Sequence, residues 1–290
     1  MEQLTVHLMD TEIYVGVKYK ENVEWIPVVK DWFTYVANEW SRFKTNNLLA
    51  TINALPIGKS LRIPPPLFEC LLVGHYYYEH TDGLFSPYLK KQMEQLGYHI
   101  TFKMIEKVPK EIDSISSIQF APCLHFKADY TIEKIADTEI DLGGFAKGYA
   151  VEYASKLLQN LGETEYGIVD GGGDMVVWSN SDKVWKVGIS NPYKPVENLE
   201  VLILKNAAIA TSNRLKRSWA NGEKNHLING QTGKFATSEV VQATVIAPTL
   251  IEAEVTAKMC FFQSSSTWFN ERFPTCKRYI VTTQTRGWQL

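Results

Sequence analysis

The sequence is poor in cysteine, and the cysteines it has are scattered. Its 290 residues include four, Cys70, Cys123, Cys260 and Cys276. No two of them have the spacing of zinc ligands or of a dithiol redox motif, which argues against both kinds of site. Cys260 lies in an apolar run, and we expect it to be a buried thiol.

An excess of charge and a long apolar run are also absent. The formal net charge is −2 and the isoelectric point is near 6.3, which argues against a general nucleic-acid binder. No run approaches the length that crosses a membrane. The stretch Met1–Leu8 has neither the basic region nor the cleavage site of a signal peptide. We therefore expect a cytoplasmic protein without a membrane span.

Glycine is concentrated in one central stretch, and two glycine turns there flank a predicted helix. The first turn is Gly143-Gly144, followed by Lys147. An apolar stripe at helical spacing then predicts a helix that Gly162 ends. A short strand at 166–169 runs into the second turn, Gly171-Gly172-Gly173-Asp174, and another strand leaves through 175–178. The residues of the stripe are Ala150, Ala154, Leu157, Leu158 and Leu161.

This arrangement suits a phosphate group. A glycine turn at a helix N-terminus offers unpaired amides and the positive end of the helix dipole, and Lys147 adds a charge in the first turn. The spacing fits neither a Walker loop nor the dinucleotide-binding fingerprint. The alternative is that two tight turns merely bracket a core helix.

The same stretch resembles a known family. Asp141 to Ala150, read as Asp-Leu-Gly-Gly-Phe-Ala-Lys-Gly-Tyr-Ala, is similar to the signature of the FAD:protein FMN transferases, the ApbE-type flavin transferases, and Gly172-Gly173-Asp174 stands where that family carries Gly-Gly-Asp. Further matches run from about Met9 to Ser264. The resemblance implies an α+β fold with mixed or antiparallel sheets and packed helices, in one large domain over residues 1–290. Residues 59–117 could contribute a smaller lobe.

Matches in the first part of the chain imply contacts with the flavin nucleotide. Met9-Asp10-Thr11, within a strand expected over 4–19, resembles the family's Met-Gly-Thr. Ser41-Arg42-Phe43, at the end of a helix expected over 25–43, and the later Asn53 match residues that line the nucleotide cleft. The alternative there is a helix end with a solvated arginine. Asp82-Gly83 follows a helix that begins at Pro64–Pro66, and the turn would hold the adenine side of FAD.

Two matches in the later part of the chain carry substitutions. Thr211-Ser212 matches the family's Thr-Ser-Gly, with Asn213 in place of the glycine; asparagine tolerates a left-handed turn. Residues 225–233 align with a histidine motif that keeps His226, Thr232 and Gly233 and departs at Asn225, Asn229 and Gly230. His226 could take a proton from an acceptor hydroxyl. Its alternative role is structural.

The resemblance also implies a divalent ion, usually Mg²⁺. Its ligands would be the Ala146 carbonyl and Glu254, with Lys258 at a position where the family carries a threonine ligand. A protonated ammonium cannot bind a metal ion and repels one. Sliding the alignment would select Glu252 and Thr256 instead. The alternative is that Glu254 and Lys258 form an ordinary i, i+4 pair on a solvated helix face.

Taken together, the resemblance predicts an enzyme that transfers FMN from FAD to a Ser/Thr hydroxyl of an acceptor flavoprotein and releases AMP. His226, Glu254 and Lys147 are the predicted catalytic residues. Flavin-binding proteins that no longer transfer, FAD pyrophosphatases and interaction modules are the alternatives. The predicted FAD-binding residues are Met9, Ser41, Phe43, Asn53, Asp82, Gly83, Gly143, Gly144, Gly172, Gly173, Asp174, Thr211 and Ser212.

Overall fold

The computed structural model describes residues 1–96, 121–216, 218–219, 224–283 and 288–289. The chain forms two compact units. The first comprises Met1–Ala37, Lys147–Asn213 and Ser238–Leu290, and the second comprises Asn38–Ala146 and Arg214–Thr237. The smaller lobe expected over 59–117 falls in the second unit as far as it is described, and residues 97–117 lie outside the described residues.

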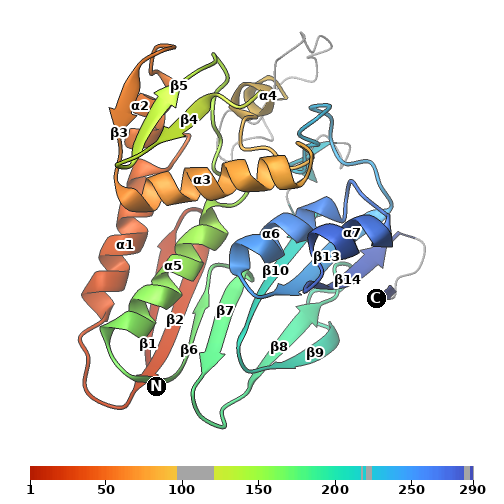
Figure 1. Ribbon diagram of the computed structural model, residues 1–290. Helices are drawn as coiled ribbons and strands as arrows, with labels where there is room; N and C mark the ends of the chain where they lie inside the picture. Colours follow the sequence, from red (N-terminus) through yellow and green to blue (C-terminus); the bar gives the residue numbers. More distant parts are fainter. Residues whose placement is uncertain (97–120, 217, 220–223, 284–287, 290) are drawn as a thin grey trace. The chain divides into compact units, whose positions relative to one another are not determined.

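An eight-stranded antiparallel sheet forms the centre of the first unit, in the order β1-β2-β6-β7-β10-β13-β14-β15 (Figure 1). The predicted α+β class with antiparallel sheets is thereby confirmed. The strands are β1 (Glu2–Leu8), β2 (Thr11–Tyr19), β6 (Thr164–Asp170), β7 (Met175–Ser179), β10 (Ala207–Asn213), β13 (Val240–Ala247), β14 (Lys277–Thr282) and β15 (Trp288–Gln289).

The strand expected over 4–19 is wrong in one respect, because it is a hairpin of two strands. Met9 and Asp10 make the turn, with φ values of 55° and 56°. Two successive left-handed residues are the geometry of a two-residue hairpin turn, for which asparagine and glycine are the usual signals. Met-Asp carries neither signal, so the alternating pattern on each side reads as continuous.

Helices pack on this sheet. They are α5 (Ala146–Leu161), α6 (Leu250–Met259) and α7 (Ser266–Arg272), and α1 (Ile26–Glu39), which begins in the first unit, packs against α5. The Trp32 indole on α1 stacks on Tyr153 of α5 and donates to the Ala150 carbonyl at 2.9 Å. Helix α6 packs along β10 and β13. The helix, strand and turn predicted for residues 146–178 are confirmed, whereas α1 ends before the predicted Phe43.

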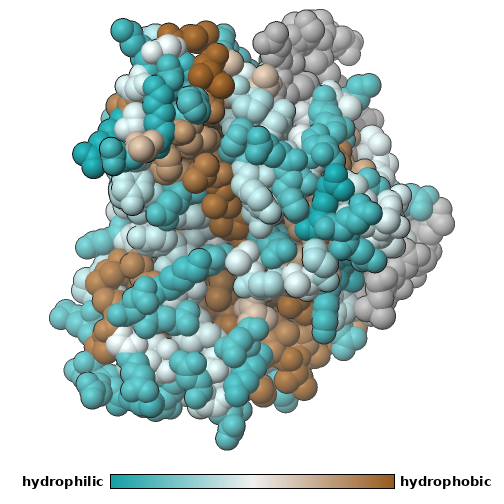
Figure 2. All heavy atoms as spheres, in the orientation of Figure 1, coloured by the Kyte–Doolittle hydropathy of each residue, from teal (hydrophilic) through white to brown (hydrophobic). Residues whose placement is uncertain are grey.

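A two-stranded ribbon, β8 (Trp185–Ser190) and β9 (Asn198–Leu204), packs on the central sheet through one face. Val187, Ile189 and Leu202 form a core cluster with Ile209 of β10. The outer face carries exposed apolar side chains, and Figure 2 shows apolar residues gathered over this ribbon. Exposed members include Val201 and Ile203.

In its described residues, the second unit contains a smaller antiparallel sheet and the helices α2, α3 and α4. The sheet has the order β3-β5-β4, and a separate short pair is formed by β11 and β12. The predicted helix start at Pro64–Pro66 is confirmed. The elements are α2 (Leu48–Asn53), β3 (Ser60–Arg62), α3 (Pro65–His80), α4 (Lys90–Gln95), β4 (Leu124–Lys127), β5 (Thr131–Lys134), β11 (Ser218–Trp219) and β12 (Lys224–Asn225).

Within the residues that the structure describes, no helix is both long enough and apolar enough to cross a membrane.

Candidate functional site

Asp174 joins three segments that the sequence had singled out separately. It is buried at the end of the glycine turn and forms an ion pair with Lys147 in the first turn of α5. Its other oxygen accepts from the Thr211 amide at 2.9 Å. The first unit therefore gathers Lys147, Gly172-Gly173-Asp174 and Thr211 around one carboxylate.

The turn before Asp174 needs its glycines. Gly172 and Gly173 have φ values of 81° and 101°, which side chains of L-residues rarely adopt. A Cβ on Gly172 would collide with the Thr11 hydroxyl, so this turn lies against the hairpin that carries Met9. Both glycines are exposed, so a ligand can approach their backbone.

Asp170 is a residue that the sequence argument missed. Its carboxylate accepts from the Gly173 amide at 2.6 Å. Burial raises the pKa of Asp170 above its ordinary value, and the neighbouring Asp174 raises it further, while the Gly173 amide and Lys147 act in the opposite direction. The signal in the sequence was its place at the last position of a buried strand, directly before three glycines.

The expectation of unpaired amides at the start of α5 is wrong for two of its residues. The Ala146 amide donates to the Leu142 carbonyl at 2.9 Å, and the Gly148 amide donates to Glu254 at 2.9 Å. A Cβ at Gly148 would collide with the Glu254 carboxylate, so only glycine allows this approach. At the N-terminal end of α5, the Asp174 carboxylate therefore already pairs with Lys147, and the Glu254 carboxylate already accepts the Gly148 amide.

Helices α5 and α6 exchange their N-terminal caps. Glu254 of α6 accepts from α5, while Glu152 of α5 accepts from the amides of Leu250 and Ile251 at 2.8 and 3.4 Å. Glu152 is buried and also pairs with Lys156. Glu152 was missed because its partner amides are nearly a hundred residues away in the sequence.

Glu254 and Lys258 pair, but not on a solvated face as the alternative supposed. Their side chains are only 6% and 15% exposed, with Nζ 3.2 Å from Oε1. The two residues that the shifted alignment selects lie in different surroundings. The Thr256 hydroxyl is 3.7 Å from the Cys276 thiol, and Glu252 also lies within hydrogen-bonding reach of that thiol. Glu254, rather than Glu252, faces α5.

In the second unit, the first glycine turn is held by Asp141. Its carboxylate pairs with Arg42 and accepts from the Gly143 amide at 2.6 Å. The Arg42 side chain is 8% exposed, so the solvated arginine considered above is wrong. Its guanidinium also lies over the exposed Phe43 ring, 4.7 Å from the centroid, and the Ser41 hydroxyl accepts from the Phe43 amide at 3.3 Å.

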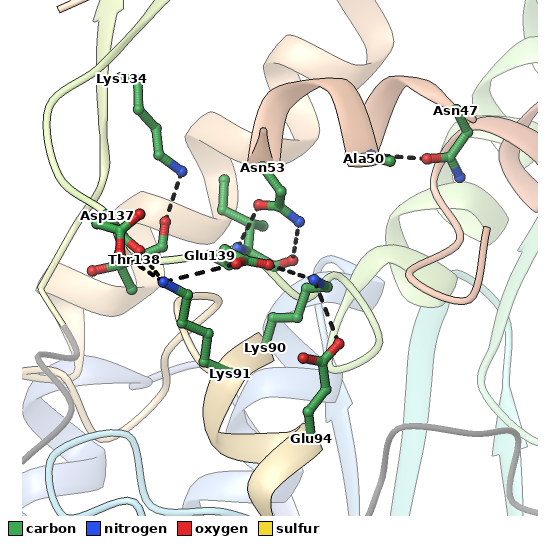
Figure 3. A network of polar contacts seen from close by, with 11 residues as sticks. Asn47, Ala50, Asn53, Lys90, Lys91, Glu94, Lys134, Asp137, Thr138 and Glu139 are labelled. Atoms are coloured by element: carbon green, nitrogen blue, oxygen red, sulfur yellow. Dashed lines mark hydrogen bonds and ion pairs between the residues drawn. The ribbon is translucent and has the colours of Figure 1, made fainter. Parts of the chain in front are cut away.

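Each residue leading into this turn has its own anchor (Figure 3). Asn53 is one: its amide group donates to the Ile140 carbonyl at 3.0 Å and accepts from the Ile140 amide at 2.8 Å. Lysines bind the preceding residues, through the pairs Lys91–Asp137, Lys134–Thr138 and Lys90–Glu139. The predicted nucleotide contact Asn53 therefore has both of its polar atoms committed to the backbone.

The Asp82-Gly83 turn lies against the histidine motif in the second unit. Asp82 and Gly83 have φ values of 54° and 80°, and the Gln231 side chain donates to the Asp82 carbonyl at 2.7 Å. The Gly230 amide donates to the Leu84 carbonyl at 2.9 Å, and a Cβ at Gly230 would collide with the Gly83 carbonyl. The departure at Gly230 is thus explained by close backbone packing.

The departure at Asn229 is also structural. Its side-chain oxygen accepts from the amides of Gln231 and Thr232 at 2.9 and 3.0 Å, which closes the loop on itself. His226 is half-buried two residues after β12 begins. The left-handed turn expected at Asn213 is wrong: this residue ends β10, and its buried side chain donates to Gln242 at 3.0 Å.

The structure thus brings Met9, Lys147, Gly172, Gly173, Asp174 and Thr211 together in the first unit, with Glu254 and Lys258 at the start of α5. Ser212 is buried beside Thr211 in β10. In the second unit it groups Ser41, Phe43 and Asn53 with the loop that carries Gly143 and Gly144. It groups Asp82 and Gly83 with the loop that follows His226. Both units place at least one exposed glycine beside a buried, paired carboxylate: Gly143 with Asp141, and Gly172 and Gly173 with Asp174.

The fold of this chain is similar to that of solved ApbE structures. The chain aligns with the crystal structure of the ApbE protein from Thermotoga maritima at a TM-score of 0.84 and 20% identity, covering 97% of this chain and 94% of that one. The model of the ApbE family matches residues 9–273. The chain belongs to the ApbE family.

Curated relatives carry the name FAD:protein FMN transferase. One from Buchnera aphidicola subsp. Schizaphis graminum is 24% identical over 224 residues, which cover 74% of this chain. Another, from Rhodobacter capsulatus, is 23% identical over 241 residues, or 78% of this chain. The matched regions span 65% and 44% of the lengths of these two relatives.

Proposed function

We propose that the protein transfers FMN from FAD to a Ser or Thr hydroxyl of an acceptor flavoprotein and releases AMP. The observation that carries the proposal is the convergence of Lys147, the glycine turn and Thr211 on Asp174, in a chain whose relatives bear the name of this transferase. The turn offers exposed backbone to a phosphate, and Lys147 offers a compensating charge.

The reaction needs a proton acceptor and a way to hold two phosphates. The acceptor oxygen forms a new bond to the FMN phosphorus, the bond from that phosphorus to the bridging oxygen breaks, and AMP leaves with the electron pair. His226 takes the proton of the attacking hydroxyl. Lys147, released from Asp174 by the more negative pyrophosphate, compensates the charge that develops.

The remaining predicted contacts keep their proposed roles toward FAD. Met9, Ser41, Phe43 and Asn53 belong to the flavin-nucleotide side, and Asp82 with Gly83 belongs to the adenine side. Asn53 acts by fixing the backbone at Ile140, because both polar atoms of its side chain are bonded there. The cytoplasmic location stays a prediction.

The expected Mg²⁺ ligands do not fit that ion as they are arranged. Glu254 uses one oxygen for the Gly148 amide and the other for the Lys258 ammonium. Among the described residues no cluster of three histidine, cysteine, aspartate or glutamate side chains is present to complete a site. The reaction proposed above therefore contains no step through a metal ion.

The test is to incubate the protein with FAD and a small acceptor domain that carries a candidate threonine, with and without Mg²⁺, beside His226→Ala. We expect covalent FMN on the acceptor, seen as a mass increase and in-gel fluorescence, with AMP released and the product lost in the variant. Free FMN with AMP would indicate a pyrophosphatase. FAD binding without either product would indicate a flavin-binding protein, and no FAD binding would indicate an interaction module.

A further inference from the structure

The pair of Glu254 and Lys258 has an unusual environment for an ion pair one helical turn apart. The Lys258 ammonium lies 3.2 Å from Oε1 and 3.3 Å from the backbone carbonyl of Glu254. Both side chains are largely removed from solvent. A lysine that is only stabilising a helix surface keeps its ammonium in water, so this one has a specific position.

The second oxygen of Glu254 reaches the amide of Gly148, in the first turn of α5. Three positive groups or partial charges therefore meet at this end of α5: the Lys258 ammonium, the N-terminus of the helix and, beside Gly148 in the chain, Lys147. Two carboxylates, Glu254 and Asp174, compensate them. The arrangement is balanced by residues of the chain itself.

A divalent ion would have to displace these contacts. Mg²⁺ requires near-octahedral oxygen coordination at short distances, while both oxygens of Glu254 are engaged and the ammonium would repel the ion. The adjacent face of α6 offers no substitute, since Glu252 and the wholly buried Thr256 face Cys276. A thiol is a soft ligand, whereas Mg²⁺ prefers hard oxygen ligands, so Cys276 does not complete a magnesium site there.

We propose that Lys258 is a built-in cation that takes the place of a divalent ion toward the FAD pyrophosphate, so that the protein binds FAD without a divalent metal. The inference rests on the proposed function in taking FAD as the ligand. Lys258 exchanges its contact with the Glu254 carboxylate for one with a phosphate oxygen. Glu254 keeps its bond to the Gly148 amide, and its backbone carbonyl, 3.3 Å from Nζ, keeps the ammonium in place.

The experiment measures the FAD dissociation constant by titration calorimetry in EDTA and in Mg²⁺. The proteins are the wild type, Lys258→Met, Lys258→Thr and Lys258→Arg, with Lys194→Met as the control from an exposed i, i+3 pair with Glu197. We expect the wild type and Lys194→Met to bind within about threefold in the two buffers. Lys258→Met should lose at least about tenfold in both, as expected for a charged hydrogen bond to phosphate. Lys258→Thr should lose as much in EDTA and recover in Mg²⁺.

Lys258→Arg keeps the charge and should bind FAD in EDTA, so it separates the charge from a packing defect in the methionine variant. Wild-type binding that weakens tenfold or more in EDTA would overturn the inference and leave the transferase standing. Binding by Lys258→Met equal to the wild type would also overturn it. FAD binding in both buffers without transfer would remove the proposed function and keep the inference, whereas no FAD binding in either buffer would remove both.

Discussion

The two glycine turns of the central stretch share a plan and differ in how they are held. Each has a buried aspartate that pairs with a cation and accepts a backbone amide. At the first turn the partners are Arg42 and Asp141, with side chains 8% and 8% exposed; at the second they are Lys147 and Asp174, 20% and 12% exposed. The ion pair at the first turn is almost completely buried, whereas the ion pair at the second turn is nearer to solvent.

The backbone conformations of the two glycine turns also differ. The first turn contains no left-handed glycine and is positioned by side chains on its approach, such as Asn53. The second turn has two left-handed glycines and depends on their missing Cβ atoms. A planar, permanently charged arginine suits a fixed structural pair, whereas lysine suits a charge that changes partner. If the proposed function holds, we expect the second turn to meet the ligand and the first, where Gly143 and Gly144 were predicted to contact FAD, to act mainly as scaffold.

The largest effect on stability should come from breaking the buried Arg42–Asp141 ion pair. Arg42→Met leaves the buried Asp141 carboxylate without its cation, and we expect a loss of about 3–5 kcal/mol in the free energy of unfolding. Lys20→Met, at the exposed Lys20–Glu163 pair, should change it by less than about 1 kcal/mol. Urea unfolding measures both. Equal effects of the two substitutions would mean that Asp141 is not held as described.

The second turn should be destabilised by substitutions that add a Cβ atom to its left-handed glycines. Gly172→Ala combines left-handed strain with a collision against Thr11, and we expect a loss of about 2–3 kcal/mol. Gly173→Ala has the strain and open space around its Cβ, so its loss should be about 1–2 kcal/mol. If Gly173→Ala were the more damaging in urea unfolding, packing against the hairpin would not be the reason for glycine at 172.

Substitution of Lys147 should lower both the stability and the FAD affinity, and the two effects can be measured separately. Lys147→Met should cost about 1–2 kcal/mol of stability, less than Arg42→Met, because the Lys147–Asp174 pair is more exposed than the Arg42–Asp141 pair and Asp174 keeps the Thr211 amide. The same variant should weaken FAD binding at least about tenfold, since a phosphate contact is lost. Calorimetric titration with FAD checks this. A variant that binds FAD like the wild type would return Lys147 to a purely structural role.

The smallest effect concerns Asp170 and depends on pH. Because burial raises its pKa in the folded state, its ionised form destabilises the fold at neutral pH, and protonation relieves this as the pH falls through the folded pKa. Asp170→Asn should therefore be the more stable protein at neutral pH. Its advantage should shrink on acidification and vanish below the ordinary aspartate value of 3.8. A stability difference that stays constant from pH 7 to about 3 would contradict this.

Local patterns predicted the elements around these turns well. The glycines, the apolar stripe and the short apolar runs predicted α5, β6 and β7, and Pro64–Pro66 predicted α3. The Met9-Asp10 turn and the strand position of Asn213 were missed, because both depend on pairing with another strand rather than on residue type. Tertiary pairing decides such positions.

The partners of the candidate site were harder to predict. Arg42 and Asp141 are far apart in the sequence, as are Glu152 and the amides of α6, and no spacing rule connects them. One miss had a usable signal. Helix α6 has apolar residues around its whole circumference, which indicates a buried helix and therefore a buried Glu254–Lys258 pair.

The exchanged caps of α5 and α6 also bear on how the chain reaches its fold. Each helix leaves N-terminal amides unsatisfied until the other is in place, and the residues concerned lie about a hundred positions apart. Contacts so distant in sequence form late, because the loop between them must close first. A chain still emerging from the ribosome can form the turns of α5 early, but it completes that helix end only after residue 254 is available. The last third of the chain is thus needed to complete the N-terminal end of α5, which lies in the middle of the sequence.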